Sequence, residues 1–373
     1  MRVLHLLSRF DANGSGGRTA RFINTIGKGV EHVIVSAEAD ACWASDLIDR
    51  NIGVTYPTGF PPLTGAPTPG RLQRLAKAMR GHDLILTYGC GAMDAVMAHT
   101  LFGELHGLAP LVHHEDALGG EEAQGRKRSR TWYRRIALGR ASRVIVPSRQ
   151  LEAIARESWQ LPAGKVKRIA NGIDTAAYGR KLKPDVLPRV IKRPGERWLG
   201  TLAHLKPDRN LPRLIRAFAE LPEEWQFVIV GDGPEREAIR EEALRLDVAH
   251  RVHLPGPVTD PAAVVGLFDL FALSSDSDQI SLAEVMAAGL PIASIGTGEV
   301  VELVAEENLP FVILADDEGA LGSALVALAQ DEVLRRRVGD ANRRRAKAEF
   351  DMKAMIAAYR NVYAQALRRQ SFP

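Results

Sequence analysis

The sequence predicts an α/β protein of two domains, each built on a parallel sheet with helices on both faces. Short apolar segments alternate with amphipathic helical segments along the chain, which is typical of parallel α/β folds. A length of 373 residues is enough for two domains, each with a core of its own. The stretch between residues 174 and 196 lacks periodicity and is rich in Lys, Arg and Pro, which indicates a linker.

Each half of the chain contributes six short apolar segments that we expect to be buried strands. In the first half they are residues 3–7, 32–36, 83–87, 110–113, 143–147 and 166–169. In the second half they are residues 197–202, 227–230, 252–254, 270–273, 291–294 and 311–313. Amphipathic helices are expected at residues 211–221 and 236–246, and a last one at residues 352–367.

Composition excludes several classes of protein. Two cysteines, Cys42 and Cys90, are too few for a disulfide scaffold or a Cys-rich zinc site, and they fit a reducing compartment. No apolar stretch of about 18 residues is free of charge, so we expect no membrane-spanning helix. The first seven residues fit a buried strand better than the apolar core of a signal peptide.

Charge is distributed unevenly between the two halves. Residues 1–189 contain 27 Lys and Arg against 17 Asp and Glu, a net charge of +10. Residues 190–373 contain 22 against 28, a net charge of −6. A basic half joined to an acidic half suggests that one domain faces an anionic partner, such as a phosphate-rich ligand, a nucleic acid or an anionic membrane surface.

Two polar loops follow strands of the first half. The loop before the first helix contains Gly16 and Gly17, which would let the backbone approach a phosphate at a helix N-terminus, although a plain tight turn explains them equally well. The spacing is not that of a dinucleotide fingerprint. The second loop follows His113 and His114 with two acidic residues. For it we weigh a metal or acid–base site, a hydrogen-bonded loop, and a polar contact to substrate, and favour the last.

Two further loops follow strands of the second half. His204, Lys206 and Arg209 occupy one strand-to-helix turn, where an anionic ligand between them would explain cations that otherwise oppose the helix dipole. The alternative is a solvated charged loop. Farther on, Glu284 sits in an apolar helical run, and a half-buried carboxylate needs partners such as ribose hydroxyls.

Taken in order, these segments resemble the retaining glycosyltransferases of the GT-B fold, in glycosyltransferase family 4. The resemblance covers nearly the whole chain, and the order and spacing of its motifs carry it more than any single motif does. The motifs are the Gly16-Gly17 loop, the His at the end of the fourth strand, and residues 144–148, 171–174, 200–210, 230–234 and 284–291.

The resemblance implies a nucleotide-sugar donor, UDP- or GDP-linked, held mainly by the second domain. Glu284 would bind the ribose hydroxyls. The acid eight residues earlier, Asp276, would contact the donor sugar, and Asp278 competes for that role if the loop is two residues shorter than in the family. The family's Arg and Lys, which neutralise the diphosphate, correspond to His204 and Arg209 here, and Lys206 would compensate for the change to His.

The first domain would complete the site. Gly16 and Gly17 would lie against the diphosphate, and one of the two histidines, His114 rather than His113, would contact the sugar near its anomeric carbon. The implied mechanism is front-face, retaining and independent of metal or other cofactors, with His114, Arg209 and Asp276 as catalytic residues. Two other classes stay open, namely a non-catalytic relative that binds nucleotide or glycan, and a GT-B nucleotide-sugar epimerase.

The resemblance also suggests domain limits. Residues 1–174 would form an acceptor domain, 175–196 a linker, 197–351 a donor domain, and 352–373 a helix that crosses back to the first domain. The acceptor would be a glycan or a lipid-linked sugar used in polysaccharide or glycolipid synthesis.

A basic segment with interleaved aromatic residues lies in the first half. A run of this kind is often a solvated helix face, and docking to an anionic membrane is the functional interpretation. The segment contains Arg126, Lys127, Arg128, Arg130 and Trp132. We therefore expect a cytoplasmic enzyme, peripheral on the inner face of the membrane. No nucleic-acid module is apparent, and the sequence specifies no oligomeric state.

Overall fold

The computed structural model describes residues 1–11, 14–38, 43–116, 128–179, 185–258, 260–274, 279–296, 298–313 and 317–373. These residues form two compact units. Unit 1 contains Met1–Ala170 and Met355–Pro373, and unit 2 contains Asn171–Ala354. The described residues of the segment expected to be a linker, 175–196, therefore group with unit 2.

Unit 1 is built on a seven-stranded sheet in the order β3-β2-β1-β4-β5-β6-β7, and every pairing among its strands is parallel. Its strands are β1 (Arg2–Leu7), β2 (Glu31–Ser36), β3 (Val54–Thr55), β4 (Leu84–Tyr88), β5 (Leu111–His114), β6 (Arg143–Val146) and β7 (Val166–Arg168). The two-residue β3 is not among the strands expected from the sequence, because its segment is too short to show a pattern.

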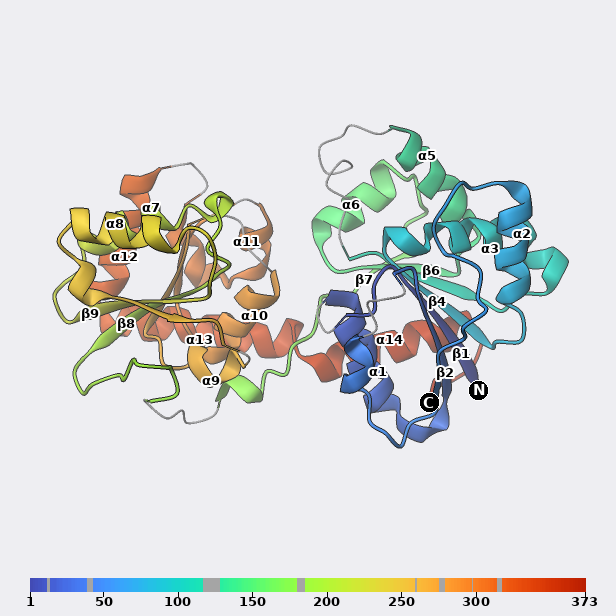
Figure 1. The fold of residues 1–373 in the computed structure, drawn as a ribbon, viewed down its shortest axis with the longest axis horizontal. Helices are drawn as coiled ribbons and strands as arrows, with labels where there is room; N and C mark the ends of the chain where they lie inside the picture. Colours follow the sequence, from blue (N-terminus) through green and yellow to red (C-terminus); the bar gives the residue numbers. More distant parts are fainter. Residues whose placement is uncertain are drawn as a thin grey trace. The chain divides into compact units, whose positions relative to one another are not determined.

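Helices cover both faces of this sheet. The α-helices of unit 1 are α1 (Gly14–Ile26), α2 (Pro69–Ala78), α3 (Met93–His106), α5 (Arg128–Ala137), α6 (Arg149–Glu157) and most of α14 (Met352–Ala366). Figure 1 shows α1 and α14 on one side of the sheet and α2, α3, α5 and α6 on the other. The C-terminal helix is held to α1 by aromatic contacts, such as Phe22 edge-on to Tyr363 with ring centroids 5.4 Å apart.

Unit 2 is built on a six-stranded sheet in the order β10-β9-β8-β11-β12-β13, again with parallel pairings. Its strands are β8 (Arg197–Leu202), β9 (Trp225–Val230), β10 (Val252–Gly256), β11 (Leu270–Leu273), β12 (Ile292–Ile295) and β13 (Val312–Ile313). The two parallel sheets confirm the predicted α/β fold of two Rossmann-like domains.

The helices of unit 2 pack through apolar faces that the sequence pattern already indicates. On α7, for example, Leu211, Leu214, Ile215 and Phe218 recur at helical spacing and are all buried. The α-helices are α7 (Leu211–Ala219), α8 (Arg236–Arg245), α9 (Ala262–Val265), α10 (Gln279–Ala288), α11 (Gly298–Leu303), α12 (Glu318–Gln330) and α13 (Glu332–Glu349).

Short 3₁₀ turns connect several of these elements. They are η1 (Gly27–Gly29), η2 (Trp43–Leu47), η3 (Cys90–Ala92), η4 (Leu138–Arg140), η5 (Ala177–Gly179), η6 (Pro207–Arg209), η7 (Ala249–Arg251) and η8 (Glu306–Phe311). Among the described helices, none combines the length and the apolar character needed to cross a bilayer.

Candidate functional site

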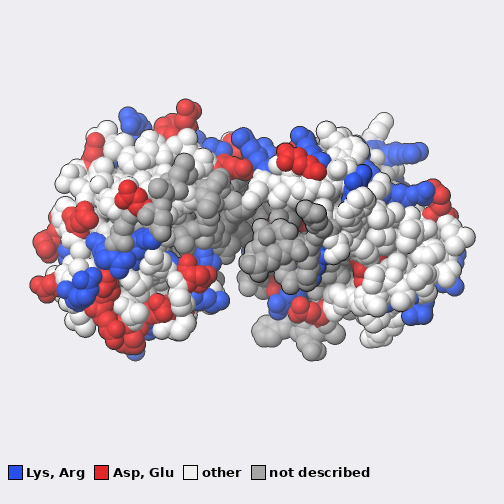
Figure 2. All heavy atoms as spheres, turned by 90° about the horizontal axis from the view of Figure 1, so that it is seen from above, with Lys and Arg blue, Asp and Glu red and all other residues white. Residues whose placement is uncertain are grey.

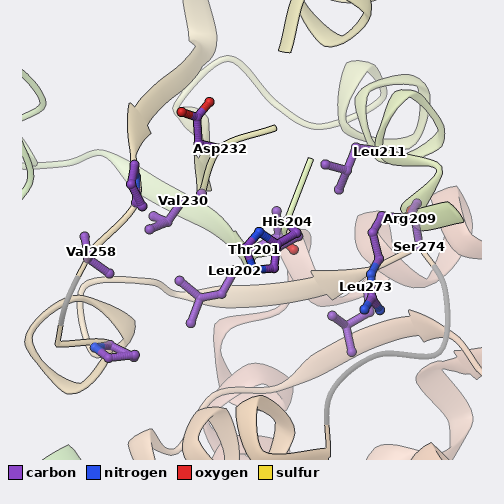
Figure 3. A pocket seen from close by; sticks show the side chains of 14 residues that line it. Thr201, Leu202, His204, Arg209, Leu211, Val230, Asp232, Val258, Leu273 and Ser274 are labelled. Carbon is purple, nitrogen blue, oxygen red and sulfur yellow. The ribbon is translucent and has the colours of Figure 1, made fainter. Parts of the chain in front are cut away.

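A pocket of about 430 Å³ opens at the carboxyl ends of β8, β9 and β11 in unit 2 (Figure 3). Strand order reverses between β8 and β11 in this sheet, and ligands of open α/β folds bind at such a point. The residues that line the pocket are Thr201, Leu202, Ala203, His204, Arg209, Leu211, Val230, Gly231, Asp232, Pro257, Val258, Pro261, Leu273 and Ser274.

Close backbone packing shapes the floor of this pocket. Gly231 follows β9 with φ +146°, a conformation that favours glycine, and a Cβ there would collide with the carbonyl oxygen of Ala203. The Gly231 N–H donates to the carbonyl of Gly256, 3.0 Å away, which ties the loop after β9 to the end of β10. The loops after β8, β9 and β10 are therefore held together around one cavity.

Of the three predicted donor-binding residues in this turn, His204 and Arg209 line the pocket and Lys206 does not. His204 is exposed after β8, and Arg209 is half-buried at the end of η6. The Arg209 carbonyl accepts a hydrogen bond from the hydroxyl of Ser274, which fixes the turn to the end of β11. In Figure 3, Arg209 and Ser274 lie together on one side of His204. Lys206 is exposed.

The predicted carboxylates are described only in part. Asp276 and Asp278 lie outside the described residues. Glu284 lies on α10, where it is half-buried between buried apolar neighbours such as Ala283 and Val285. Its contact with a ribose stays a prediction.

In unit 1, Gly16 and Gly17 are buried near the start of α1. A Cβ on Gly16 would collide with the backbone of Asp11, so the fold itself requires glycine at this position. The contact of Gly16 and Gly17 with a phosphate stays a prediction.

His114 ends β5 and is buried in a ring of aromatic side chains. Its Nε2 lies 2.9 Å from the hydroxyl of Tyr363 on α14, and its ring stacks on Tyr88 with centroids 4.5 Å apart. Burial lowers the pKa of His114 to about 3, and the nearby charge of Arg18 acts in the same direction. The imidazole is therefore neutral at physiological pH, so it can position a group but cannot carry a proton as an imidazolium.

A second, smaller cavity lies beside His114. Arg18 on α1 is buried there and its Nη2 lies 2.5 Å from Oδ1 of Asp116. The lining residues are Ser15, Arg18, Thr19, Phe22, Tyr88, His114, Asp116, Tyr359 and Tyr363. No local sequence pattern selects Arg18 or the tyrosines, because these residues come from three distant segments of the chain. The position of Arg18 directly after the glycine pair is the one local signal.

His113 faces the opposite side of the same sheet. Its Nδ1 lies 2.8 Å from the hydroxyl of Thr87, and the adjacent Glu115 forms a buried ion pair with Arg134 of α5. The Arg134 guanidinium also lies over the ring of Trp159, 5.0 Å from its centroid. Within the described parts of the chain, no group of three His, Cys, Asp or Glu side chains could hold a metal ion.

The basic segment is described only in part. Arg126 and Lys127 lie outside the described residues, and α5 begins at Arg128. Arg130 and Trp132 are exposed. Arg134, which follows Arg130 by four residues, is buried against Glu115 and is therefore not part of an exposed basic surface.

Two protein-family models match the chain, one in each half. The model described as Glycosyltransferase Family 4 matches residues 25–177, and the model described as Glycosyl transferases group 1 matches residues 196–331. The chain belongs to the family 4, group 1 glycosyltransferases. The predicted resemblance is therefore confirmed.

Individual relatives are distant. The chain is 23% identical over 211 residues to the N-acetyl-alpha-D-glucosaminyl L-malate synthase of Bacillus anthracis, covering 56% of this chain and 55% of that protein. It is 30% identical over 215 residues to the phosphatidyl-myo-inositol mannosyltransferase of Mycobacterium leprae, covering 56% and 54%. The matches thus span about half the length of these relatives.

Solved structures of similar fold cover nearly the whole chain. HepE of Anabaena in complex with UDP superposes with a TM-score of 0.76 at 20% identity, over 98% of this chain and 100% of that one. The sucrose-phosphate synthase of Thermosynechococcus elongatus superposes with a TM-score of 0.69 at 19% identity, over 99% and 100%. These matches confirm the GT-B fold of this family 4 glycosyltransferase.

Proposed function

We propose that this chain is a retaining glycosyltransferase that moves a sugar from a nucleoside-diphosphate sugar to a glycan or a lipid-linked acceptor. The observation that carries the proposal is the pocket of unit 2, where His204 and Arg209 both line a cavity at the switch point of a parallel sheet. An arginine and a histidine in a cavity of about 430 Å³ suit a nucleoside diphosphate, because both side chains can donate hydrogen bonds to phosphate oxygens while the apolar lining can receive the base.

The lining suggests how such a donor is oriented. Arg209 and His204 would bind the diphosphate, with the hydroxyls of Thr201 and Ser274 near it, and Lys206 would add long-range charge. The apolar wall of Val230, Pro257, Val258 and Pro261 would receive the base. Glu284 would accept hydrogen bonds from the ribose hydroxyls, and Asp276 or Asp278 would contact the sugar.

UDP and GDP sugars are the two donor classes proposed. Of the two, we favour UDP sugars, because the solved structure of the Anabaena protein of similar fold is a complex with UDP.

The proposed reaction proceeds on one face of the sugar. The acceptor hydroxyl oxygen forms a bond to the anomeric carbon from the side on which the diphosphate leaves. The bond between that carbon and the phosphate oxygen breaks, its electron pair goes to the diphosphate, and the acceptor proton passes to a phosphate oxygen. Arg209 and His204 would stabilise the charge that develops on the diphosphate. Because these side chains supply the positive charge, no metal is required.

Unit 1 would hold the acceptor and complete the site. His114, kept neutral by burial, would orient the reacting sugar, and Gly16 and Gly17 would lie against the diphosphate. Two relatives are named for lipid-linked molecules: one for a diphospho-undecaprenol acceptor, and the other, a synthase, for alpha-monoglucosyldiacylglycerol. We therefore extend the proposal to a cytoplasmic enzyme that attaches to the anionic inner leaflet through the basic segment with Arg126, Lys127, Arg128 and Arg130.

Turnover of nucleotide sugars tests this proposal. A thermal-shift panel of UDP, GDP and their sugars should identify the donor, since a ligand at about 100 times its Kd adds about 2.7 kcal/mol of stability. The matching sugar nucleotide should then release free nucleoside diphosphate, faster with acceptor than without. Binding without release would favour the non-catalytic alternative, and conversion to another sugar nucleotide would favour the epimerase.

A further inference from the structure

Four large apolar side chains are exposed on two helices of unit 1. On α3, Leu101 is 55% exposed and Leu105 is 69% exposed. On α5, Trp132 is 60% exposed and Ile136 is 49% exposed. Each pair is separated by four residues, so on each helix the two side chains lie on one face, one turn apart. Together these residues are called the α3–α5 face below.

The packing of the two helices places both pairs on the outer surface of unit 1. The Tyr133 hydroxyl donates to Asp94 across 2.7 Å, and Thr100 donates to the carbonyl of Ala137 across 2.5 Å. Tyr133 and Ala137 therefore face α3, while the buried Arg134 faces the interior. Trp132 and Ile136 directly precede Tyr133 and Ala137, so their side chains point about 100° around the helix axis from the side that faces α3. Arg134 follows Tyr133, so it lies about 100° around the axis in the other direction.

The same reasoning applies to α3. Thr100 faces α5 and Gly103 is buried, so positions 101 and 105 are turned outward. Both helices thus present apolar side chains to the same exterior. Figure 2 views the molecule from the side on which α5 lies in Figure 1, and over unit 1 it shows uncharged residues with both basic and acidic residues around them.

Arginines flank the α3–α5 face. The Arg135 guanidinium lies over the Trp132 ring, 5.1 Å from its centroid, and Arg130 is exposed one turn before Arg134. Near the C-terminal end of α3, Arg140 forms an ion pair with Glu104 across 2.5 Å, so the charges of these two residues cancel there. An apolar face bordered by cations matches the boundary between acyl chains and anionic headgroups.

We propose that the α3–α5 face inserts into an anionic bilayer, with the leucines, Trp132 and Ile136 among the acyl chains and the arginines at the lipid phosphates. The inference deepens the membrane attachment proposed above and rests on it. The attachment proposed above relies mainly on the positive charge of the basic segment, whereas insertion adds an apolar contribution that salt does not screen. It also assigns a role to α3, which the basic segment does not include.

Vesicle flotation with matched variants tests insertion. Vesicles would contain phosphatidylcholine alone or a mixture with anionic phosphatidylglycerol, at about 0.1 M and about 0.5 M salt. Leu101→Gln combined with Leu105→Gln should weaken binding to the anionic vesicles by about tenfold or more at both salt concentrations, because each change removes a buried leucine from the bilayer. The control is Leu244→Gln, which replaces an equally exposed leucine on α8 of unit 2.

A second measurement reports depth directly. Brominated lipid should quench the fluorescence of Trp132, identified by its loss in Trp132→Phe, while Trp159, Trp198 and Trp225 are buried in the protein and should be unaffected. Quenching that disappears in the double leucine variant would support insertion.

The outcomes separate the two proposals. If the wild type binds no anionic vesicle even at low salt, both attachment and insertion are wrong. If the wild type binds at low salt and dissociates at high salt, and the double leucine variant behaves in the same way, attachment by charge is supported and insertion is wrong. A lipid-free dimer that the double variant abolishes would assign the face to a second copy of the chain and contradict insertion.

Discussion

Acid should unfold unit 1 before unit 2, because four histidines of unit 1 are buried in the neutral state. His5, His32, His113 and His114 are all fully or almost fully buried. Burial lowers the pKa of each below the ordinary value of 6.5, to about 4 for His32 and about 3 for His114. Charge on His32 and His114 lowers the pKa of His5 further, and the charge of Arg134 lowers the pKa of His113 further.

The sign of the effect follows from proton uptake. Between pH 6.5 and the lowered values, the unfolded chain binds protons at these histidines and the folded chain does not, so stability falls as pH falls. Each such group contributes about 1.4 kcal/mol of stability per pH unit in that window. Four groups therefore give a slope of about 5.5 kcal/mol per pH unit, which exhausts a domain stability of about 5–15 kcal/mol within about one to three pH units. In unit 2, burial lowers the pKa of one histidine, His253, which is half-buried.

Denaturant unfolding at pH 7, 6 and 5 measures this slope, and hydrogen exchange by mass spectrometry assigns it to a unit. His32→Gln removes one titrating group and should reduce the slope by about 1.4 kcal/mol per pH unit. The control, His250→Gln, changes an exposed histidine of unit 2 and should leave the slope unchanged. The reasoning is refuted if unit 1 keeps its stability at pH 5, or if unit 2 unfolds first.

Three further predictions concern the donor site. Glu284→Ala should abolish nucleotide binding, measured by calorimetry, with the circular dichroism spectrum retained; binding equal to wild type would remove Glu284 from the ribose site. His204→Arg should keep or raise turnover, since it restores the residue of the family and adds a permanent cation; a loss of turnover would mean that the imidazole itself is required. EDTA should leave turnover unchanged, whereas a loss restored by Mg²⁺ or Mn²⁺ would place a metal at the undescribed segment around Asp276.

The sequence predicted the features that local patterns determine. Strand and helix positions follow from short apolar runs and helical spacing, and they are confirmed in both sheets. The turn with His204 and Arg209 could be found because its cations lie within six residues of one another, directly after a strand.

Features that depend on distant segments could not be predicted. The hydrogen bond between His114 and Tyr363 joins residues 249 positions apart, and no local pattern marks either as a partner of the other. Arg134 is buried because it pairs with Glu115, which lies just after β5, and no local pattern around Arg134 marks that partner. In both cases tertiary packing, not local sequence, decides the environment.

Calorimetric titration with UDP and GDP tests the central claim most directly, because it asks whether the cationic pocket of unit 2 binds a nucleoside diphosphate. Wild type and Arg240→Ala, which changes an exposed arginine of α8 paired with Glu237, should bind the preferred nucleotide equally well. Arg209→Ala should raise its Kd by about tenfold or more, since a charge-assisted hydrogen bond contributes about 1.5–3 kcal/mol. Unchanged affinity in Arg209→Ala, or no affinity of the wild type for either nucleotide, would contradict the assignment of this pocket to the donor.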